Sequence, residues 1–219
     1  MGVMDPIRGS ILAVKFIPNV SRDLAENLKL GPDQRSIGLF TCNIDDVGYT
    51  ALDEATKKAA VDVVYAKSFY CGAAHASGPL SGEFIGILAG PDPAEVKAGV
   101  AAASQCISDD ACFYWADAED SIAFYAHTIS RTGSYLSKEA GIQEGESLAY
   151  LIAPPLEAVY GVDAALKAAD VRMAVWYGPP SETNFGGGLL TGSQSACKAA
   201  AEAFRDTVIA VARNPKDFE

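Results

Sequence analysis

Short hydrophobic runs recur along this chain, and alanine-rich stretches with helical spacing lie between them. Runs with the length and composition of β-strands lie at residues 10–18, 36–43, 61–66 and 83–90, and again at 121–129, 147–155, 171–177 and 185–190. Stretches that predict helices lie at 19–30, 50–60 and 91–103, and again at 129–141, 161–170 and 192–212. The order of elements predicts an α+β fold with two similar halves, each a sheet of about four strands with helices packed on it.

A regular spacing between similar segments indicates that the halves are a duplication. KKAAVDVVYA resembles LKAADVRMAVWY, and aligning Lys58 with Lys167 gives an offset of 167 − 58 = 109. Gly90 and Gly192 give an offset of 192 − 90 = 102, so the second half is expected to lack seven residues in the loop at 68–82. We therefore predict one domain at residues 1–110 and a second at 111–219.

Two helix starts carry capping patterns. Thr50, followed three residues later by Asp53, predicts the start of one helix. Asp92 before Pro93 predicts the start of another, because an aspartate caps free N–H groups and proline fits the first turn.

Charge and cysteine content narrow the class of protein. The formal net charge is −11 and no cluster of Lys and Arg is present, which argues against nucleic acid or an anionic membrane surface as a partner. No apolar run has the length of a membrane helix, and the first residues do not resemble a signal peptide. Five cysteines without a CxxC pair are typical of reduced thiols in a cytoplasmic protein, and we expect neither a metal site nor a cofactor.

Candidate chemistry is sparse. The chain has two histidines and lacks a GxSxG elbow, an HExxH helix and a P-loop, so we predict no catalytic residues. FGGGLL at 185–190 leads into a strand instead of a helix, which argues against a phosphate site. Asp45 and Asp46 follow a strand end and are read either as a solvated acidic turn or, with Glu83 and an aromatic face, as a site for a small cation.

Several segments resemble bacterial microcompartment shell domains. GVDAALKAADVRMAV is similar to the helix-to-strand segment of that family, and GLLTGSQSACKAAAEAF is similar to its strand-to-last-helix segment. DDVGYTALDEATK, LAYLIAPPLEAVYG and PPSETNFGGGLLTGSQSACKAA resemble the ethanolamine-utilization members, over nearly the whole chain. The resemblance implies two tandem, circularly permuted shell domains per chain. It further implies a homotrimer that imitates a hexagonal tile, packed with other shell proteins around a compartment in the bacterial cytoplasm.

The resemblance also implies particular sites. In this family the loops matching 68–82 and 178–187 surround a gated central opening for metabolites or cofactors, and smaller acidic openings bind ethanolamine. The expected gate residues are Phe69, Tyr70, Gly72, His75, Glu182, Thr183, Asn184 and Phe185. The expected ethanolamine-binding residues are Asp45, Asp46, Glu83, Phe113 and Thr183. Lys58 and Lys167 are expected at the edge between neighbouring tiles. Ethanolamine is expected to favour the closed gate.

Two other functions remain open from the residues alone. One is a small-molecule enzyme with an active site between the halves, in which Cys71 and His75 would be the reactive pair. The other is a soluble sensor that binds its ligand through Asp45 and Asp46 without forming a lattice.

Overall fold

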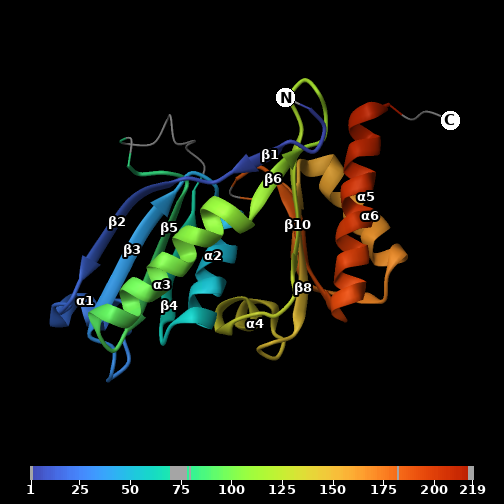
Figure 1. The fold of residues 1–219 in the computed structure, drawn as a ribbon. Helices are drawn as coiled ribbons and strands as arrows, with labels where there is room; N and C mark the ends of the chain where they lie inside the picture. Colours follow the sequence, from blue (N-terminus) through green and yellow to red (C-terminus); the bar gives the residue numbers. More distant parts are fainter. Residues whose placement is uncertain (1, 70–77, 79, 182, 217–219) are drawn as a thin grey trace. The chain divides into compact units, whose positions relative to one another are not determined.

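The computed structural model describes residues 2–69, 78, 80–181 and 183–216. Its contacts divide the chain into two compact units, which are coloured along the sequence in Figure 1. One unit, called here the first-copy unit, contains Arg8–Ala111 together with Gly133–Leu136. The second-copy unit contains Met1–Ile7, Cys112–Thr132 and Ser137–Glu219. The boundary predicted between residues 110 and 111 stays a prediction.

The first-copy unit is built on a four-stranded antiparallel sheet in the order β2-β3-β5-β4. Its elements are β2 (Ile11–Ile17), α1 (Arg22–Asn27), β3 (Ser36–Cys42), α2 (Asp45–Lys58), β4 (Asp62–Ser68), β5 (Phe84–Gly90), α3 (Pro93–Gln105) and a π-helical turn (Cys106–Asp110). Helices α2 and α3 pack on one face of the sheet. Phe40 and Phe84 are buried, whereas Leu39 and Ile85 are half-buried, so the strands alternate between two faces as their hydrophobic pattern predicts.

The second-copy unit repeats this strand order. Its elements are β1 (Pro6–Arg8), β6 (Cys112–Trp115), β7 (Ala123–Ile129), α4 (Ser134–Ala140), β8 (Ser147–Ala153), α5 (Pro155–Ala168), β9 (Val171–Tyr177), β10 (Gly186–Gly192) and α6 (Gln194–Arg213). The sheet order is β1-β6-β7-β8-β10-β9, in which β7-β8-β10-β9 corresponds to β2-β3-β5-β4. The predicted duplication and α+β fold are therefore confirmed. Strands β1 and β6 were not predicted, and they extend this sheet beyond the expected four strands.

Hydrogen-bond patterns correct the predicted alignment of the two copies. Ala59 and Ala169 end equivalent helices with nearly the same backbone angles, and each accepts from the N–H two residues later, at 2.9 Å. The offset here is 169 − 59 = 110, not 109, so Lys167 corresponds to Lys57 and not to Lys58. The carbonyl of Ala25 accepts from Leu30 and that of Ser137 accepts from Ile142, which gives 137 − 25 = 112 for α1 and α4.

The strand pairing corrects the length of the missing segment. Lys67 pairs with Ile85, 85 − 67 = 18 residues later, and Tyr177 pairs with Gly187, 187 − 177 = 10 residues later. The second copy is therefore shorter by 18 − 10 = 8 residues at this loop, not seven.

One capping prediction is right and one is wrong. The side chain of Asp92 accepts from the N–H groups of Ala94 and Glu95 at 2.7 and 3.0 Å, so α3 starts as predicted. Helix α2 instead begins at Asp45, and Thr50 lies inside it, where its hydroxyl donates to the carbonyl oxygen of Asp46 at 3.0 Å. A threonine hydroxyl satisfied by the preceding turn is compatible with the helix interior, which the local pattern did not distinguish from a cap.

Glycines allow β10 to pass close to its neighbours. Gly187 has φ +144°, and a Cβ placed on it would lie 1.9 Å from the carbonyl oxygen of Leu151 on β8. A Cβ on Gly188 would lie 2.3 Å from the carbonyl oxygen of Val175 on β9. Gly187 and Gly188 are thus required by strand packing, which supports the expectation that FGGGLL is not a phosphate loop.

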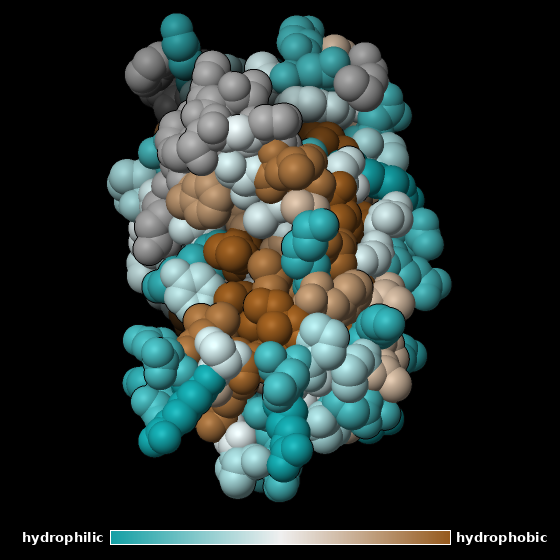
Figure 2. Space-filling model, turned by 90° about the vertical axis from the view of Figure 1, so that its left-hand side faces the viewer, coloured by the Kyte–Doolittle hydropathy of each residue, from teal (hydrophilic) through white to brown (hydrophobic). Residues whose placement is uncertain are grey.

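Figure 2 shows the side of the chain on which β2 lies in Figure 1. Hydrophobic residues gather across the middle of this side, with hydrophilic residues below them.

Candidate functional site

The acidic pair lies in the first turn of α2. Asp45 and Asp46 are 8% and 6% exposed, so these carboxyl groups are not the solvated turn that one reading of the sequence predicted. The first turn of a helix has free N–H groups and the positive end of the helix dipole, both of which favour nearby negative charge.

Glu83 is held close to this turn by the backbone. Its N–H donates to the carbonyl oxygen of Cys42 at 2.9 Å, and its own carbonyl oxygen accepts from the N–H of Phe69 at 3.0 Å. Gly82 precedes it with φ +68°, where a Cβ would lie 2.5 Å from the carbonyl oxygen of Cys42. The close approach therefore requires glycine and fixes where the Glu83 side chain starts.

Electrostatics link Glu83 to Asp45. Burial raises the pKa of the Glu83 carboxyl, and the negative charge of Asp45 raises that pKa further. Burial also raises the pKa of the Cys42 thiol to about 12, with additional contributions from both carboxylates. Asp45 and Glu83 therefore form one negative cluster, in which a cation would relieve the repulsion between two partly desolvated charges.

Asp46 acts on a different neighbour. Burial raises the pKa of the Tyr49 hydroxyl, and the charges of Asp45 and Asp46 raise it as well. The hydroxyl of Tyr49 donates to Ser68 Oγ at 3.2 Å, at the end of β4.

The other two predicted ligand residues belong to the second-copy unit. Phe113 is 6% exposed on β6, where its ring stacks on Tyr125 with centroids 5.1 Å apart and lies 6.3 Å from the ring of Phe185. Thr183 lies in the connection between β9 and β10, and its hydroxyl is 3.3 Å from that of Ser181. Within this unit, Phe185 joins the aromatic row of β6 and β7 to the turn that carries Thr183.

The predicted gate is described only in part. Phe69, Thr183, Asn184 and Phe185 are described, and Asn184 adopts φ +66° in a turn where its N–H donates to the carbonyl oxygen of Ser181 at 3.0 Å. Outside the described residues lie Tyr70, Gly72, His75 and Glu182, together with Cys71.

Both predicted edge lysines lie at the surface. The side chain of Lys58 is 62% exposed and its Nζ is 3.7 Å from Glu54 Oε1, whereas that of Lys167 is 75% exposed and its Nζ is 2.6 Å from Asp163 Oδ2. Lys57, the true counterpart of Lys167, is only 25% exposed and pairs with Glu54 and, at 3.7 Å, with Asp53.

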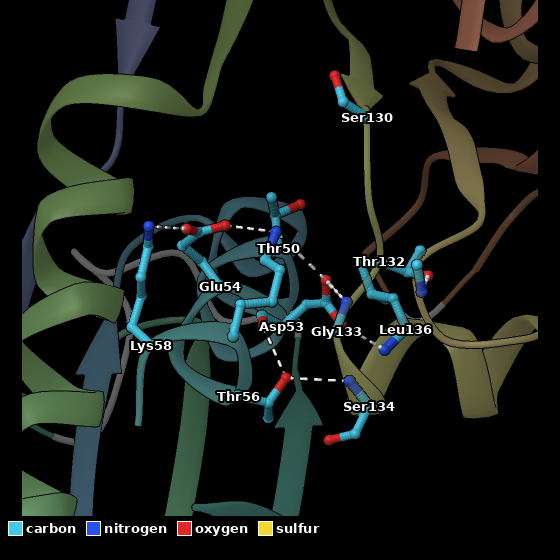
Figure 3. A network of polar contacts seen from close by, with 12 residues as sticks. Thr50, Asp53, Glu54, Thr56, Lys58, Ser130, Thr132, Gly133, Ser134 and Leu136 are labelled. Atoms are coloured by element: carbon cyan, nitrogen blue, oxygen red, sulfur yellow. Dashed lines mark hydrogen bonds and ion pairs between the residues drawn. The ribbon is translucent and has the colours of Figure 1, made fainter. Parts of the chain in front are cut away.

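A buried polar network around Asp53 was missed by sequence reasoning (Figure 3). The carboxylate of Asp53 is 1% exposed and accepts from the backbone N–H groups of Gly133 and Leu136, each at 2.8 Å. Beside it, Thr56 Oγ1 accepts from the N–H of Ser134 at 3.1 Å and donates to the carbonyl oxygen of Asp53 at 2.7 Å. These partners lie about eighty positions apart in the sequence, and no local pattern joins them.

In the part of the chain that the structure describes, no cluster of three or more His, Cys, Asp or Glu could hold a metal ion. None of the helices there is both long and apolar enough to cross a membrane. Four cysteines are described as free and buried, namely Cys42, Cys106, Cys112 and Cys197.

Comparison with known proteins identifies the family. Residues 36–114 match the BMC domain model. The chain is 61% identical to the bacterial microcompartment shell protein EutL of Clostridium perfringens over 98% of this chain and 99% of that protein. It is 54% identical to EutL of Escherichia coli over 98% of both chains. The crystal structure of the ethanolamine utilization protein EutL from Leptotrichia buccalis superposes with a TM-score of 0.96 at 64% identity, covering 99% of this chain and all of that one. The predicted tandem, permuted shell-domain fold is confirmed, and the chain belongs to the EutL family of bacterial microcompartment shell proteins, which are structural proteins of a cytoplasmic compartment and not enzymes.

Proposed function

We propose that this chain forms a trimeric tile in the shell of an ethanolamine-utilization microcompartment, with a gated central opening and an ethanolamine site that controls it. The observation that supports the trimer is the duplication, because the strand order β2-β3-β5-β4 recurs as β7-β8-β10-β9 in one chain. Three chains would supply six equivalent units, which is the number needed for a hexagonal tile. Metabolites or cofactors of the enclosed enzymes would pass through the opening between loops 68–82 and 178–187.

The proposed ethanolamine site uses the negative cluster at the start of α2. Ethanolamine carries an ammonium group at neutral pH, and Asp45 and Glu83 supply two carboxylates whose mutual repulsion the cation would cancel. Asp46 adds charge in the same helical turn. Phe113 is assigned as an aromatic face for the ammonium and Thr183 as a partner of the ligand hydroxyl.

Ligand binding would act on the gate through differential affinity. Glu83 accepts from Phe69 through its backbone, so the proposed ligand site is joined directly to the start of the gate loop. A ligand that binds one loop arrangement more tightly shifts the population toward that arrangement, and a preference of about 1–3 kcal/mol changes the ratio roughly five- to 150-fold. We assign the closed arrangement as the preferred one.

Isothermal titration calorimetry with ethanolamine tests the site. Asp45→Asn and Glu83→Gln should each weaken binding by about 2 kcal/mol or more, because a charge-assisted contact is lost in a partly buried place. Asp206→Asn is the matched control, since this carboxylate is 66% exposed and lies on α6. Unchanged affinity in both cluster variants would remove the site.

Hydrogen exchange of peptides 68–82 and 178–187 tests the gate. Ethanolamine should increase amide protection in both loops of the wild type and leave the Glu83→Gln variant unchanged. Decreased protection on binding would contradict the proposed direction of gating.

The lattice contact is tested by electron microscopy of sheets. Lys58→Ala and Lys167→Ala should leave trimers intact and weaken their edge-to-edge packing, because a lysine buries its long stem and donates from its ammonium across such an edge. Loss of the trimer itself in both variants would show that these residues are wrongly assigned.

A further inference from the structure

One face of α5 is apolar and exposed. Leu156, Val159 and Tyr160 are 60%, 50% and 60% exposed, and they share a helical face with Asp163, whose side chain is 57% exposed. The opposite face of α5 is already buried in its own unit, through residues such as Val162. An amphipathic helix normally exposes its polar side, so a second apolar face on α5 indicates a contact that a single chain leaves unmade.

The equivalent face of α2 shows what such a contact looks like. With the offset of 110, Asp163 corresponds to Asp53 and Tyr160 to Thr50, which are 1% and 5% exposed. Residues 133–136 cover this face of α2, because Gly133 and Leu136 donate their N–H groups to the Asp53 carboxylate at 2.8 Å. Next to these contacts, the rings of Tyr49 and Tyr135 stack with centroids 6.4 Å apart.

The segment equivalent to 133–136 is also exposed. With the offset of 112 between α1 and α4, it is residues 21–24, and all four are exposed. Leu24 is 38% exposed, whereas its counterpart Leu136 is 2% exposed. Each half of the chain thus has one helix face and one covering segment. Within one chain the face of α2 is covered by residues 133–136, whereas the face of α5 and residues 21–24 are exposed.

We infer that residues 21–24 of a second copy of this chain cover the exposed face of α5. In this contact Leu24 packs against Leu156, Val159 and Tyr160, and the carboxylate of Asp163 accepts from the backbone N–H groups of Ser21 and Leu24. The face and the segment are different surfaces, so the contact is head-to-tail and can close into a ring. The inference rests on the proposed trimer and specifies the surface that holds it together.

The inferred contact between two copies differs in two ways from the contact of residues 133–136 with α2 within one chain. Ser21 replaces Gly133, and a Cβ at Gly133 would lie 2.6 Å from the carbonyl oxygen of Asp53, so residues 21–24 must lie farther from α5 than 133–136 lie from α2. The apolar Leu156, Val159 and Tyr160 take the places of Asp46, Tyr49 and Thr50. Leu156 and Tyr160 are larger than the Asp46 and Thr50 that they replace. Their apolar surface fills the wider separation and adds burial to the hydrogen bonds.

Analytical ultracentrifugation of three variants tests this surface. Tyr160→Asp and Leu24→Asp should each weaken association by on the order of a hundredfold, because each places a charge in a desolvated apolar contact. Ala210→Asp is the matched control, because it adds the same charge to an exposed position on α6 outside both surfaces, and it should assemble like the wild type. Circular dichroism should show the same fold for all three, since every substituted side chain is exposed.

Hydrogen exchange supplies a second measurement. In the wild-type assembly the amides of residues 21–25 should be protected, and Tyr160→Asp should remove that protection although the substitution lies far away in the sequence. If the wild type is trimeric and both surface variants remain trimeric, the inferred contact is wrong while the trimer stands. If the wild type stays a single chain at every concentration, the proposed trimer itself is wrong.

Discussion

Asp53→Ala should destabilise the first-copy unit far more than an ordinary surface substitution. The carboxylate is 1% exposed and accepts from the N–H groups of Gly133 and Leu136, both at 2.8 Å. Alanine would leave two buried donors without their acceptor, and each such loss costs about 1–3 kcal/mol. Loss of the carboxylate also leaves Lys57 with one acidic neighbour fewer.

The desolvation of the Asp53 carboxylate makes the expected loss of stability smaller than two unpaired donors alone would cause. Burial raises the pKa of its carboxyl above the ordinary value even though two N–H groups favour the charged form. The folded state therefore holds the proton more tightly than the unfolded state, and the charge costs stability as the pH rises through this window. Removing the buried charge returns part of that cost, so we expect a net loss of about 2–4 kcal/mol at pH 7.

Urea unfolding followed by circular dichroism measures the effect, at one fixed protein concentration because an assembly is stabilised by mass action. Asp206→Ala is the control, since its carboxylate also has an ion-pair partner at 2.8 Å but is 66% exposed, and it should cost at most about 1 kcal/mol. Hydrogen exchange should in addition show lost protection at residues 133–136. Equal stability of the two variants would refute the argument that burial makes the Asp53 contacts strong.

Ethanolamine should bind with full affinity above the raised pKa of Glu83, and the affinity should be lost as the pH falls through that pKa, at a higher pH than for an exposed glutamate. Titration calorimetry from pH 7 to pH 4 measures this loss, and an affinity independent of pH would contradict it. Burial raises the pKa of the Cys42 thiol from 9.0 to about 12, so its thiolate population in the folded protein is roughly a thousandfold smaller than that of an exposed cysteine. Alkylation of Cys42 with iodoacetamide at pH 8, followed by mass spectrometry, should therefore be far slower in the folded protein than in urea. Gly187→Ala should lower the free energy of unfolding by more than about 4 kcal/mol, because the added Cβ would lie 1.9 Å from a backbone oxygen. Gly141→Ala, with φ +61° and open space around it, should lower it by only about 1 kcal/mol. Similar melting temperatures for the two variants would show that β10 moves away easily.

Local pattern was sufficient where a feature depends on neighbours in the sequence. Strands such as Ser36–Cys42 and Phe84–Gly90 were predicted within a residue or so, because the two faces of a strand impose a period of two on hydrophobic residues. The cap at Asp92 was predicted for the same reason, since its partners are two and three residues away. The duplication and the family followed from segments compared along the chain.

Features that depend on distant partners required the tertiary structure. The sequence did not show that the Asp53 carboxylate accepts hydrogen bonds from Gly133 and Leu136. It also did not show that Glu83 and Asp45 lie close enough, in a partly buried place, for their charges to interact. Strands β1 and β6 were missed because they have only three and four residues, too few for a periodic pattern. Each is defined by its pairing in the sheet.

The alignment of the copies shows the division between sequence and structure most directly. Sequence similarity found the repeat but placed Lys58 where the helix ends put Lys57, since several alanines and lysines match almost equally well after a shift of one residue. Helix ends and strand registers removed the ambiguity, because a shift of one residue would turn every side chain of a strand to the other face of its sheet. Sequence period determined which elements form, and the geometry of their packing decided which residues correspond, which carboxylates are buried and which face of α5 stays exposed.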